Sequence, residues 1–169
     1  MAAIRVGGRP TCITAAAMSD LWTPDHTDLH VAVLGNASRL DATGLRLHWA
    51  PGPAPIGRLS TKEPIVNVLF QVARCVPRDD ALAVWESAIR AKRVDPKTLS
   101  LVAWHSPAAA ELARVASDLS DSGLETRFIH GLRRAGIGVR QQVFLAGHPV
   151  DGLIGDPISA GPACFRLIA

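Results

Sequence analysis

Residues 120–156 read SDSGLETRFIHGLRRAGIGVRQQVFLAGHPVDGLIGD, and the order of elements in this stretch decides the fold of the last third of the chain. Asp121 or Ser122 can cap a helix that runs to Gly136, since glycine is common just past a helix end. The short GHP connection then predicts a hairpin of two β-rich runs, 139–145 and 150–154. The sequence therefore predicts a helix followed by a hairpin.

Two acidic side chains lie in this segment at positions that can serve a metal ion. Glu125 falls in the first turn of the predicted helix, and Asp151 falls in the second predicted strand. Hydrolysis of a phosphodiester uses a divalent cation to activate water, and carboxylate oxygens are the ligands that Mg²⁺ prefers. Two acids alone are a weak signal, because an acid also favours a helix N-terminus or a turn.

The sequence that surrounds these two acids is a more specific signal of function. The segment resembles the restriction-endonuclease-like PD-(D/E)xK domains related to very-short-patch-repair endonucleases, which are frequent at the C-terminus of actinobacterial proteins. In that family a helix with an S-G-x-E glutamate precedes a Gln-containing strand and a V-D-x-L-I-G-D strand, and residues 118–156 follow this order. The resemblance implies that Glu125 and Asp151 are catalytic metal ligands for Mg²⁺ and that the substrate is DNA.

The sequence departs from this family after Asp156. The next strand of the family carries E-x-D or E-x-K, but these positions fall near Gly161 and Ala163 here. Pro157 and Pro162 lack backbone donors, so we expect the usual sheet to end after its second strand. The active site is then incomplete, and truncation or a frameshift of an ancestral nuclease gene is the preferred explanation.

Basic side chains surround the predicted helix and the strand that follows it. They can contact phosphates beside a nuclease cleft, and a solvated helix face explains them about equally well. They are Arg127, Arg133, Arg134 and Arg140. His130 and His148 flank the same segment, and we expect both at the surface.

The middle of the chain, residues 58–117, predicts a small helical bundle. Apolar residues recur at three- and four-residue spacing, and prolines or proline-containing pairs begin or end each pattern. In the second pattern acidic residues come first and basic residues last, as the helix dipole favours. Four helices are predicted, over 65–76, 79–93, 96–104 and 107–115.

The first part of the chain, residues 1–57, is predicted to be a small α/β segment with a helix over 11–22 and two strands over 29–34 and 45–49. PGPAPIG, residues 51–57, is the first linker. The runs VGGRPTCITAAAMSDLW and LHVAVLGNASRL are similar to actinobacterial proteins whose first part resembles an AbiEi-type antitoxin, a winged-helix DNA-binding unit followed by a small α/β domain. The chain begins where that winged helix would end, so DNA binding does not carry over.

Cysteines and histidines give little sign of a metal site. Cys12, Cys75 and Cys164 are far apart and form no C-x-x-C pair, so neither a disulfide framework nor a zinc site is indicated. We interpret them as reduced thiols of a cytoplasmic protein. His26 and His30 have the i, i+4 spacing of zinc ligands, but a proline and a β-rich run flank them, so a shared helical face is not expected.

Composition and patterning together predict a soluble α+β protein without a membrane partner. Net charge is +3, 48% of residues are hydrophobic, and no apolar run approaches the length of a membrane span. The expected parts are an antitoxin-like α/β segment (1–57), a helical middle (58–117) and a truncated nuclease-like domain (118–169). The first functional hypothesis is a degenerate DNA endonuclease-like protein without full phosphodiesterase activity. The alternative is a non-catalytic antitoxin-like module that associates with DNA or with a protein partner.

Overall fold

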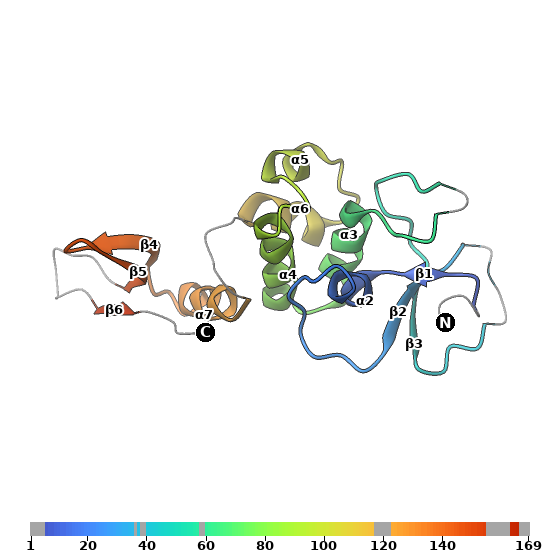
Figure 1. Cartoon of the computed structure of the whole chain (residues 1–169), viewed down its shortest axis with the longest axis horizontal. Coiled ribbons are helices and arrows are strands. Elements are labelled where there is room, and N and C mark those ends of the chain that lie inside the picture. The colour runs from blue at the N-terminus through green and yellow to red at the C-terminus, as the bar shows by residue number, and fades with distance from the viewer. Residues whose placement is uncertain are drawn as a thin grey trace.

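The computed structural model describes residues 6–35, 37, 40–57, 60–116, 123–154 and 163–165. Within them, helices and two small sheets form an α+β fold, as the sequence predicts. The two sheets lie at opposite ends of the long axis, and the helices lie between them (Figure 1). No helix in these ranges is long and apolar enough to cross a membrane.

The N-terminal sheet has three short strands in the order β1 (Arg9–Pro10), β2 (Leu29–Ala32) and β3 (Leu45–His48). β1 is antiparallel to β2, and β2 is parallel to β3. Side chains alternate between the two faces of a strand. On one face Val31 packs with Val6 and Val33, and Leu45 and Leu47 complete this small apolar cluster. His30 and His48 are therefore left to the other face.

α2 (Cys12–Ala17) follows β1 directly and is shorter than the helix predicted over 11–22. The hydroxyl of Ser19 donates to the carbonyl of Ala15 over 2.8 Å, which satisfies a carbonyl of the last turn. Asp20 then adopts the left-handed region with φ 58°, and this conformation ends the helix before Leu21.

The helical middle contains the four predicted helices, α3 (Ile65–Cys75), α4 (Arg78–Arg90), α5 (Pro96–Leu101) and α6 (Pro107–Val115). The side chains of Asp95 and Ser106 cap α5 and α6 by accepting backbone N–H groups. The main core lies between α2, α3, α4 and α6. Its largest fully buried side chain is Trp85, whose indole N–H donates to the carbonyl of Leu69 over 3.1 Å.

The C-terminal part consists of α7 (Gly123–Arg134), β4 (Val139–Leu145), β5 (His148–Ile154) and β6 (Ala163–Phe165). The predicted helix and hairpin are both present, and Ala146 and Gly147 form the turn with φ 48° and 84°. Two successive residues with positive φ match the twist of antiparallel strands.

The expectation that this sheet ends after two strands is wrong. β6 pairs antiparallel with β5, and Ala163 lies opposite Ile154 in the register. The prolines that motivated the expectation, Pro157 and Pro162, both precede β6 and so do not interrupt its pairing. Pro157, Pro162 and Gly161 lie outside the described residues.

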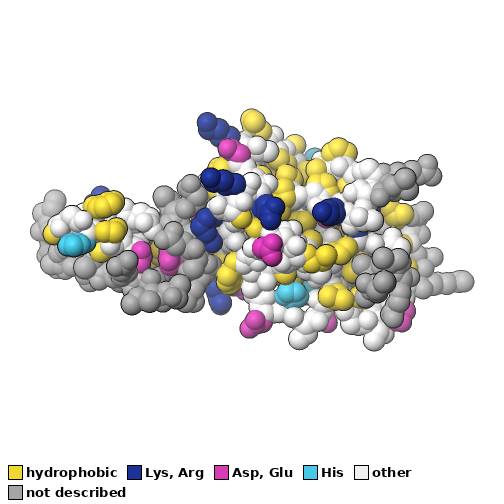
Figure 2. All heavy atoms as spheres, in the orientation of Figure 1, with side chains coloured by type: hydrophobic (Ala, Val, Ile, Leu, Met, Phe, Trp, Pro, Cys, Tyr) yellow, Lys and Arg dark blue, Asp and Glu magenta, His cyan; other side chains and the backbone are white. Residues whose placement is uncertain are grey.

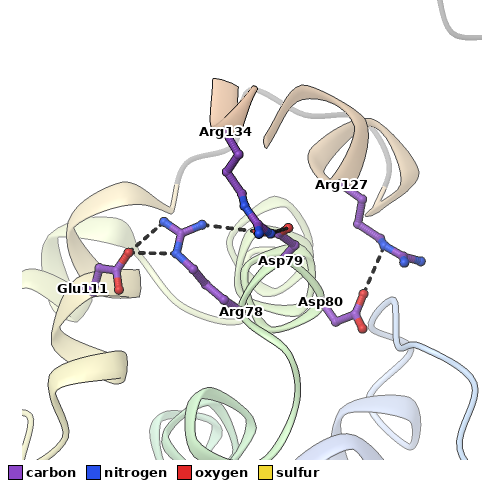
Figure 3. A network of polar contacts seen from close by, with 6 residues as sticks. All are labelled: Arg78, Asp79, Asp80, Glu111, Arg127 and Arg134. Atoms are coloured by element: carbon purple, nitrogen blue, oxygen red, sulfur yellow. Dashed lines mark hydrogen bonds and ion pairs between the residues drawn. The ribbon is translucent and has the colours of Figure 1, made fainter. Parts of the chain in front are cut away.

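α7 joins the C-terminal part to the helical middle by packing on α4. Ile129 is 1% exposed in this contact, and the Thr126 hydroxyl donates to the buried carboxylate of Glu86 over 2.6 Å. Two ion pairs cross the same interface on its exposed side, Arg127 with Asp80 and Arg134 with Asp79 (Figure 3).

Candidate metal centre

Four metal-ligating side chains meet between the N-terminal sheet and the helices that cover it. Their ligand atoms, two thiol sulfurs and two imidazole nitrogens, all lie within 4.8 Å of one another. Each comes from a different element: Cys12 opens α2, His30 lies in β2, His48 ends β3 and Cys75 ends α3. Cys12 and His30 are buried, and His48 and Cys75 are half-buried.

The separations among the ligand atoms of His30, His48 and Cys75 fit a tetrahedral ion. His30 Nδ1 and His48 Nε2 are 3.0 Å apart, and Cys75 Sγ is 3.6 Å from the first and 3.9 Å from the second. A tetrahedral zinc ion with bonds of about 2.0 Å to nitrogen and about 2.3 Å to sulfur places N–N pairs about 3.3 Å and N–S pairs about 3.5 Å apart. The observed separations therefore need only small side-chain adjustments to accept Zn²⁺.

Strand register brings the two histidines to one face of the sheet. In the parallel pair, His30 lies opposite Arg46 and Ala32 lies opposite His48. Paired residues of neighbouring strands point to the same face, and positions two apart along a strand share a face. His30 and His48 therefore lie on one face, and the Val31 cluster lies on the other.

Cys12 is held in place by the turn from β1 into α2. The backbone N–H of Thr11 donates to the carbonyl of His30 over 3.0 Å, and the Thr14 hydroxyl accepts the N–H of His30 over 2.8 Å. Cys12 itself has φ 52°, a left-handed conformation that costs about 1 kcal/mol for a residue with a Cβ. Strained residues of this kind cluster at functional sites.

The amide of Gln71 orients the ring of His48 and favours one of its two tautomers. Gln71 lies one helical turn before Cys75, is 2% exposed, and donates its amide N–H to the carbonyl of Ala50 over 2.6 Å. Its remaining polar atom, Oε1, is an acceptor and lies 3.2 Å from His48 Nδ1. His48 Nδ1 therefore carries the proton, and Nε2 keeps its lone pair toward the other ligands. Metal-binding histidines are commonly oriented in this way by a hydrogen bond from the second ring nitrogen.

The two cysteines shift each other's pKa in opposite directions. A hydrogen bond from the Cys12 thiol, aided by the two imidazoles, holds the pKa of Cys75 far below its ordinary value. The same hydrogen bond and burial raise the pKa of Cys12. The lowered pKa favours the thiolate form of Cys75, which is the form that binds a cation, and Cys12 must release its proton when an ion binds.

The chemistry of this donor set favours zinc over the hard cations. Two thiolates and two imidazoles suit Zn²⁺, whereas Mg²⁺ prefers oxygen ligands and does not fit this cluster. Four protein ligands fill a tetrahedral shell and leave no position for a reactive water. The arrangement is that of a structural site rather than a catalytic one.

The carboxylates singled out in the sequence lie elsewhere. Glu125 is in the first turn of α7 and is 4% exposed, and Asp151 is half-buried in β5. Neither belongs to a group of three or more potential metal ligands within the described part of the chain, where the Cys/His cluster is the group found. Ala163, one of the two positions expected to lack a third-strand ligand, opens β6.

Three of the four predicted phosphate-binding arginines contact the protein itself. Arg127 pairs with Asp80 at 3.1 Å and Arg134 with Asp79 at 2.9 Å (Figure 3), and Arg133 donates to Gln141 at 3.1 Å. Arg140 is exposed in β4. On the face shown in Figure 2, basic and acidic side chains are interspersed over the helical middle and do not form one basic band.

Histidines of the predicted nuclease-like segment play no part in the cluster. Burial and the charge of Arg133 lower the pKa of His130, which is half-buried, and His148 is exposed at the start of β5. His26 is exposed and its ring stands edge-on to that of His30, with centroids 6.3 Å apart. His30 is therefore a candidate metal ligand together with residues of the neighbouring strand and helices, and not together with His26.

The candidate metal centre was not predicted from the sequence, because metal ligands were expected at short spacing along the chain. The expectation that the cysteines indicate no zinc site rested on their separation along the chain, whereas Cys12 and Cys75 lie together in one cluster as free thiols. A usable signal was present in the strands LHVA and LRLH, where each histidine alternates with apolar residues of the opposite face. Comparisons of this chain with protein-family models, with curated proteins and with solved structures found no match.

Proposed function

We propose that this chain is a zinc-binding protein in which one Zn²⁺, held by Cys12, His30, His48 and Cys75, stabilises the N-terminal sheet and its covering helices. The observation that supports this proposal is the convergence of four ligand atoms within 4.8 Å from four separate elements. An ion at this point would link α2, β2, β3 and α3 to one another. Its role is structural, because all four coordination positions are supplied by the protein.

The small size of the neighbouring core gives the metal a large effect on folding. The apolar cluster on the opposite face of the sheet contains three buried residues, Val6, Val31 and Val33. By contrast, the core of the helical middle contains most of the buried apolar side chains, Trp85 among them. Binding of a structural zinc is coupled to folding of the unit that supplies the ligands. We therefore infer that the N-terminal sheet depends on the ion and that the helical core, in which α2 also packs, does not.

The metal content of the purified full chain tests this proposal. We expect one zinc per chain by elemental analysis, and a loss of that zinc in Cys12→Ser and Cys75→Ser. Glu125→Ala and Asp151→Ala serve as matched controls and should keep the zinc. Absence of zinc in the wild-type protein, with no uptake of added Zn²⁺ or Co²⁺, would refute the assignment.

The thiolate ligands also support a cytoplasmic location as part of the proposal. Thiols remain reduced in the cytoplasm, whereas oxidising compartments favour disulfides. A cytoplasmic protein would keep Cys12 and Cys75 available for the ion. Cell fractionation with antibody detection tests this, and recovery of the protein outside the cytoplasm would contradict it.

As a second function, we propose that the C-terminal part is a degenerate DNA endonuclease-like domain without full phosphodiesterase activity. The order α7, β4, β5, β6, with Glu125 in the first helical turn and Asp151 in the second strand, supports this proposal. Mg²⁺ would be the cation of such a site, held by carboxylate oxygens. The alternative proposal remains a non-catalytic module that binds DNA or a protein partner.

A nicking assay on supercoiled DNA with Mg²⁺ or Mn²⁺ tests the second proposal. We expect no cleavage above that of buffer for the wild-type chain. Metal-dependent nicking that disappears in both Glu125→Ala and Asp151→Ala would show an active nuclease and contradict the proposed degeneracy. Binding of the same DNA without cleavage would favour the non-catalytic alternative.

A further inference from the structure

A hollow of about 550 Å³ lies beside the metal centre, between β3 and the last turn of α3. His48 and Cys75 form part of its wall, so the hollow borders two of the proposed zinc ligands. Arg46, Trp49 and Arg74 also line it. These last three side chains take no part in the ligand set, and they need a separate explanation.

Among the residues that the structure describes, the positive charges of the hollow have no acidic partners. No described aspartate or glutamate lines it. Arg46 and Arg74 are exposed and form no ion pair within the described residues, whereas Arg9, Arg78, Arg127 and Arg134 each pair with a carboxylate there. With Zn²⁺ bound to two thiolates and two neutral imidazoles, the centre itself is neutral. The hollow therefore keeps two uncompensated guanidinium charges.

The two arginines are positioned by their surroundings. The guanidinium carbon of Arg74 lies 5.2 Å from the centroid of the Phe70 ring, close enough for a cation–π contact that orients the group. Arg46 lies opposite His30 in the register of β2 and β3, so it lies on the same face of the sheet as the two histidines. Planar guanidinium groups held in this way suit the oxygens of a phosphate.

Trp49 gives the hollow a flat apolar surface. It follows β3 directly and is 44% exposed, whereas Trp85 at the centre of the protein is fully buried. Exposed aromatic side chains beside basic residues provide stacking surfaces for the bases of single-stranded nucleic acids. Phosphate-binding charge and an exposed ring in one hollow point to a ligand that carries both a phosphate and an aromatic base.

We propose that this hollow binds a nucleotide, either free or as part of a single strand, with Arg46 and Arg74 on the phosphate and Trp49 against the base. The inference goes beyond the structural zinc, because none of the three residues supplies a ligand atom to the ion. A protein in which Arg46, Arg74 or Trp49 is replaced should keep its zinc. Failure of nucleotide binding is therefore distinguishable from failure of the metal proposal.

Binding to the zinc-loaded full chain tests the proposal with three probes: a labelled single-stranded oligothymidylate, a mononucleotide and inorganic phosphate. We expect saturable binding of the oligothymidylate or of the mononucleotide. Arg46→Ala/Arg74→Ala should weaken it at least tenfold, and loss of two phosphate contacts should reduce the salt slope of strand binding by about 1.4. Trp49→Ala should weaken binding of either base-containing probe about tenfold, the size of one lost stacking contact.

Controls and outcomes separate the parts of the proposal. Arg114→Ala removes an exposed arginine of α6 outside the hollow and should leave binding unchanged. Zinc content and circular dichroism of each variant verify that the fold persists. Oligothymidylate binding without mononucleotide binding identifies a single strand as the ligand, and equal binding identifies a free nucleotide. Absence of saturable binding of both, or equal affinity of wild type and the double variant, would overturn the proposal, as would phosphate binding that exceeds nucleotide binding.

Discussion

In the part of the chain that the structure describes, the two sheets have the same number of strands but rely on different sources of stability. In the β1–β2–β3 sheet the strands are two to four residues long, and a Cys/His cluster joins the sheet to α2 and α3. In the β4–β5–β6 sheet the two main strands have seven residues each and are joined by a tight turn. α7 then attaches this second sheet to α4. The first sheet therefore depends on side chains from distant parts of the sequence, whereas the second depends on the pairing of strands that are neighbours in the sequence.

Removal of the metal should produce the largest difference between the two sheets. A structural zinc in a small unit stabilises the folded state by about 10 kcal/mol or more. After treatment of the full chain with a strong chelator, we expect amide exchange to become fast in β1, β2 and β3. Amide exchange in β4 and β5 should not change. Hydrogen exchange with mass spectrometry measures both sheets in one sample. Equal deprotection of both sheets would show that the two regions do not differ as proposed.

Truncation of Trp85 should instead destabilise the helical middle, which lies between the two sheets (Figure 1). Trp85 is 0% exposed and its ring lies 5.1 Å from that of Trp104. Trp85→Ala should lower the free energy of unfolding by about 3–5 kcal/mol, measured by denaturant unfolding of the zinc-loaded protein. Trp49→Ala is the matched control, since Trp49 is exposed and should change stability by less than about 0.5 kcal/mol.

Removal of one buried hydrogen bond should loosen only the second sheet. Thr126 is 1% exposed and donates to Glu86, which is 3% exposed. Thr126→Val removes a donor to a buried carboxylate and should lower stability by about 1.5–3 kcal/mol. Faster exchange should appear in α7 and β4, with zinc content unchanged. Thr43→Val, at an exposed hydroxyl that donates to exposed Asp41, should have little effect.

A change in pH should have a smaller effect on the free energy of unfolding, through one buried carboxyl group beside the N-terminal sheet. Burial raises the pKa of the Glu63 carboxyl above its ordinary value of 4.5, against the opposing charge of Arg9. A raised pKa means that the folded state favours the protonated form, so this contribution to stability is lost as pH rises above 4.5 through the folded pKa. The stability difference between Glu63→Gln and wild type should therefore grow in favour of the variant as pH rises, in urea unfolding at a series of pH values. A difference independent of pH would contradict this.

The smallest effect should come from the exposed ion pair between Arg127 and Asp80, whose side chains are 53% and 15% exposed. Pairs of this kind contribute about 0–1 kcal/mol and are screened by salt. Arg127→Ala should therefore change the unfolding midpoint slightly at low salt and not at all at high salt. A loss above about 2 kcal/mol would indicate that this pair, rather than Thr126 and Glu86, secures α7.

Local patterns in the sequence were sufficient for the helices and for the hairpin. The three- and four-residue spacing of apolar residues predicted α3, α4 and α6, because burial of one helix face follows directly from that spacing. The glycine at position 147 and the flanking β-rich runs likewise indicated β4 and β5. The third strand, β6, was not predicted, since its three residues carry almost no local signal and its pairing depends on β5.

The metal centre could not be predicted from local spacing because its ligands converge only in the folded chain. Cys12 and Cys75 are brought together by the packing of α2 on α3, and His30 meets His48 through a parallel register. No fixed motif encodes that arrangement, since each separation depends on intervening loops. Glu125 and Asp151 show the converse case, with a specific local pattern but no place in a group of three or more ligands among the residues that the structure describes.

X-ray absorption spectroscopy at the zinc edge, on the full chain purified without added metal, identifies the atoms that bind the ion. We expect two sulfur atoms at about 2.3 Å and two nitrogen atoms at about 2.0 Å around the zinc. Cys75→Ser should lower the sulfur count or abolish zinc binding, and Asp151→Ala should leave the spectrum unchanged. A shell of oxygen and nitrogen without sulfur, or a protein that contains no zinc and takes up none, would contradict the account.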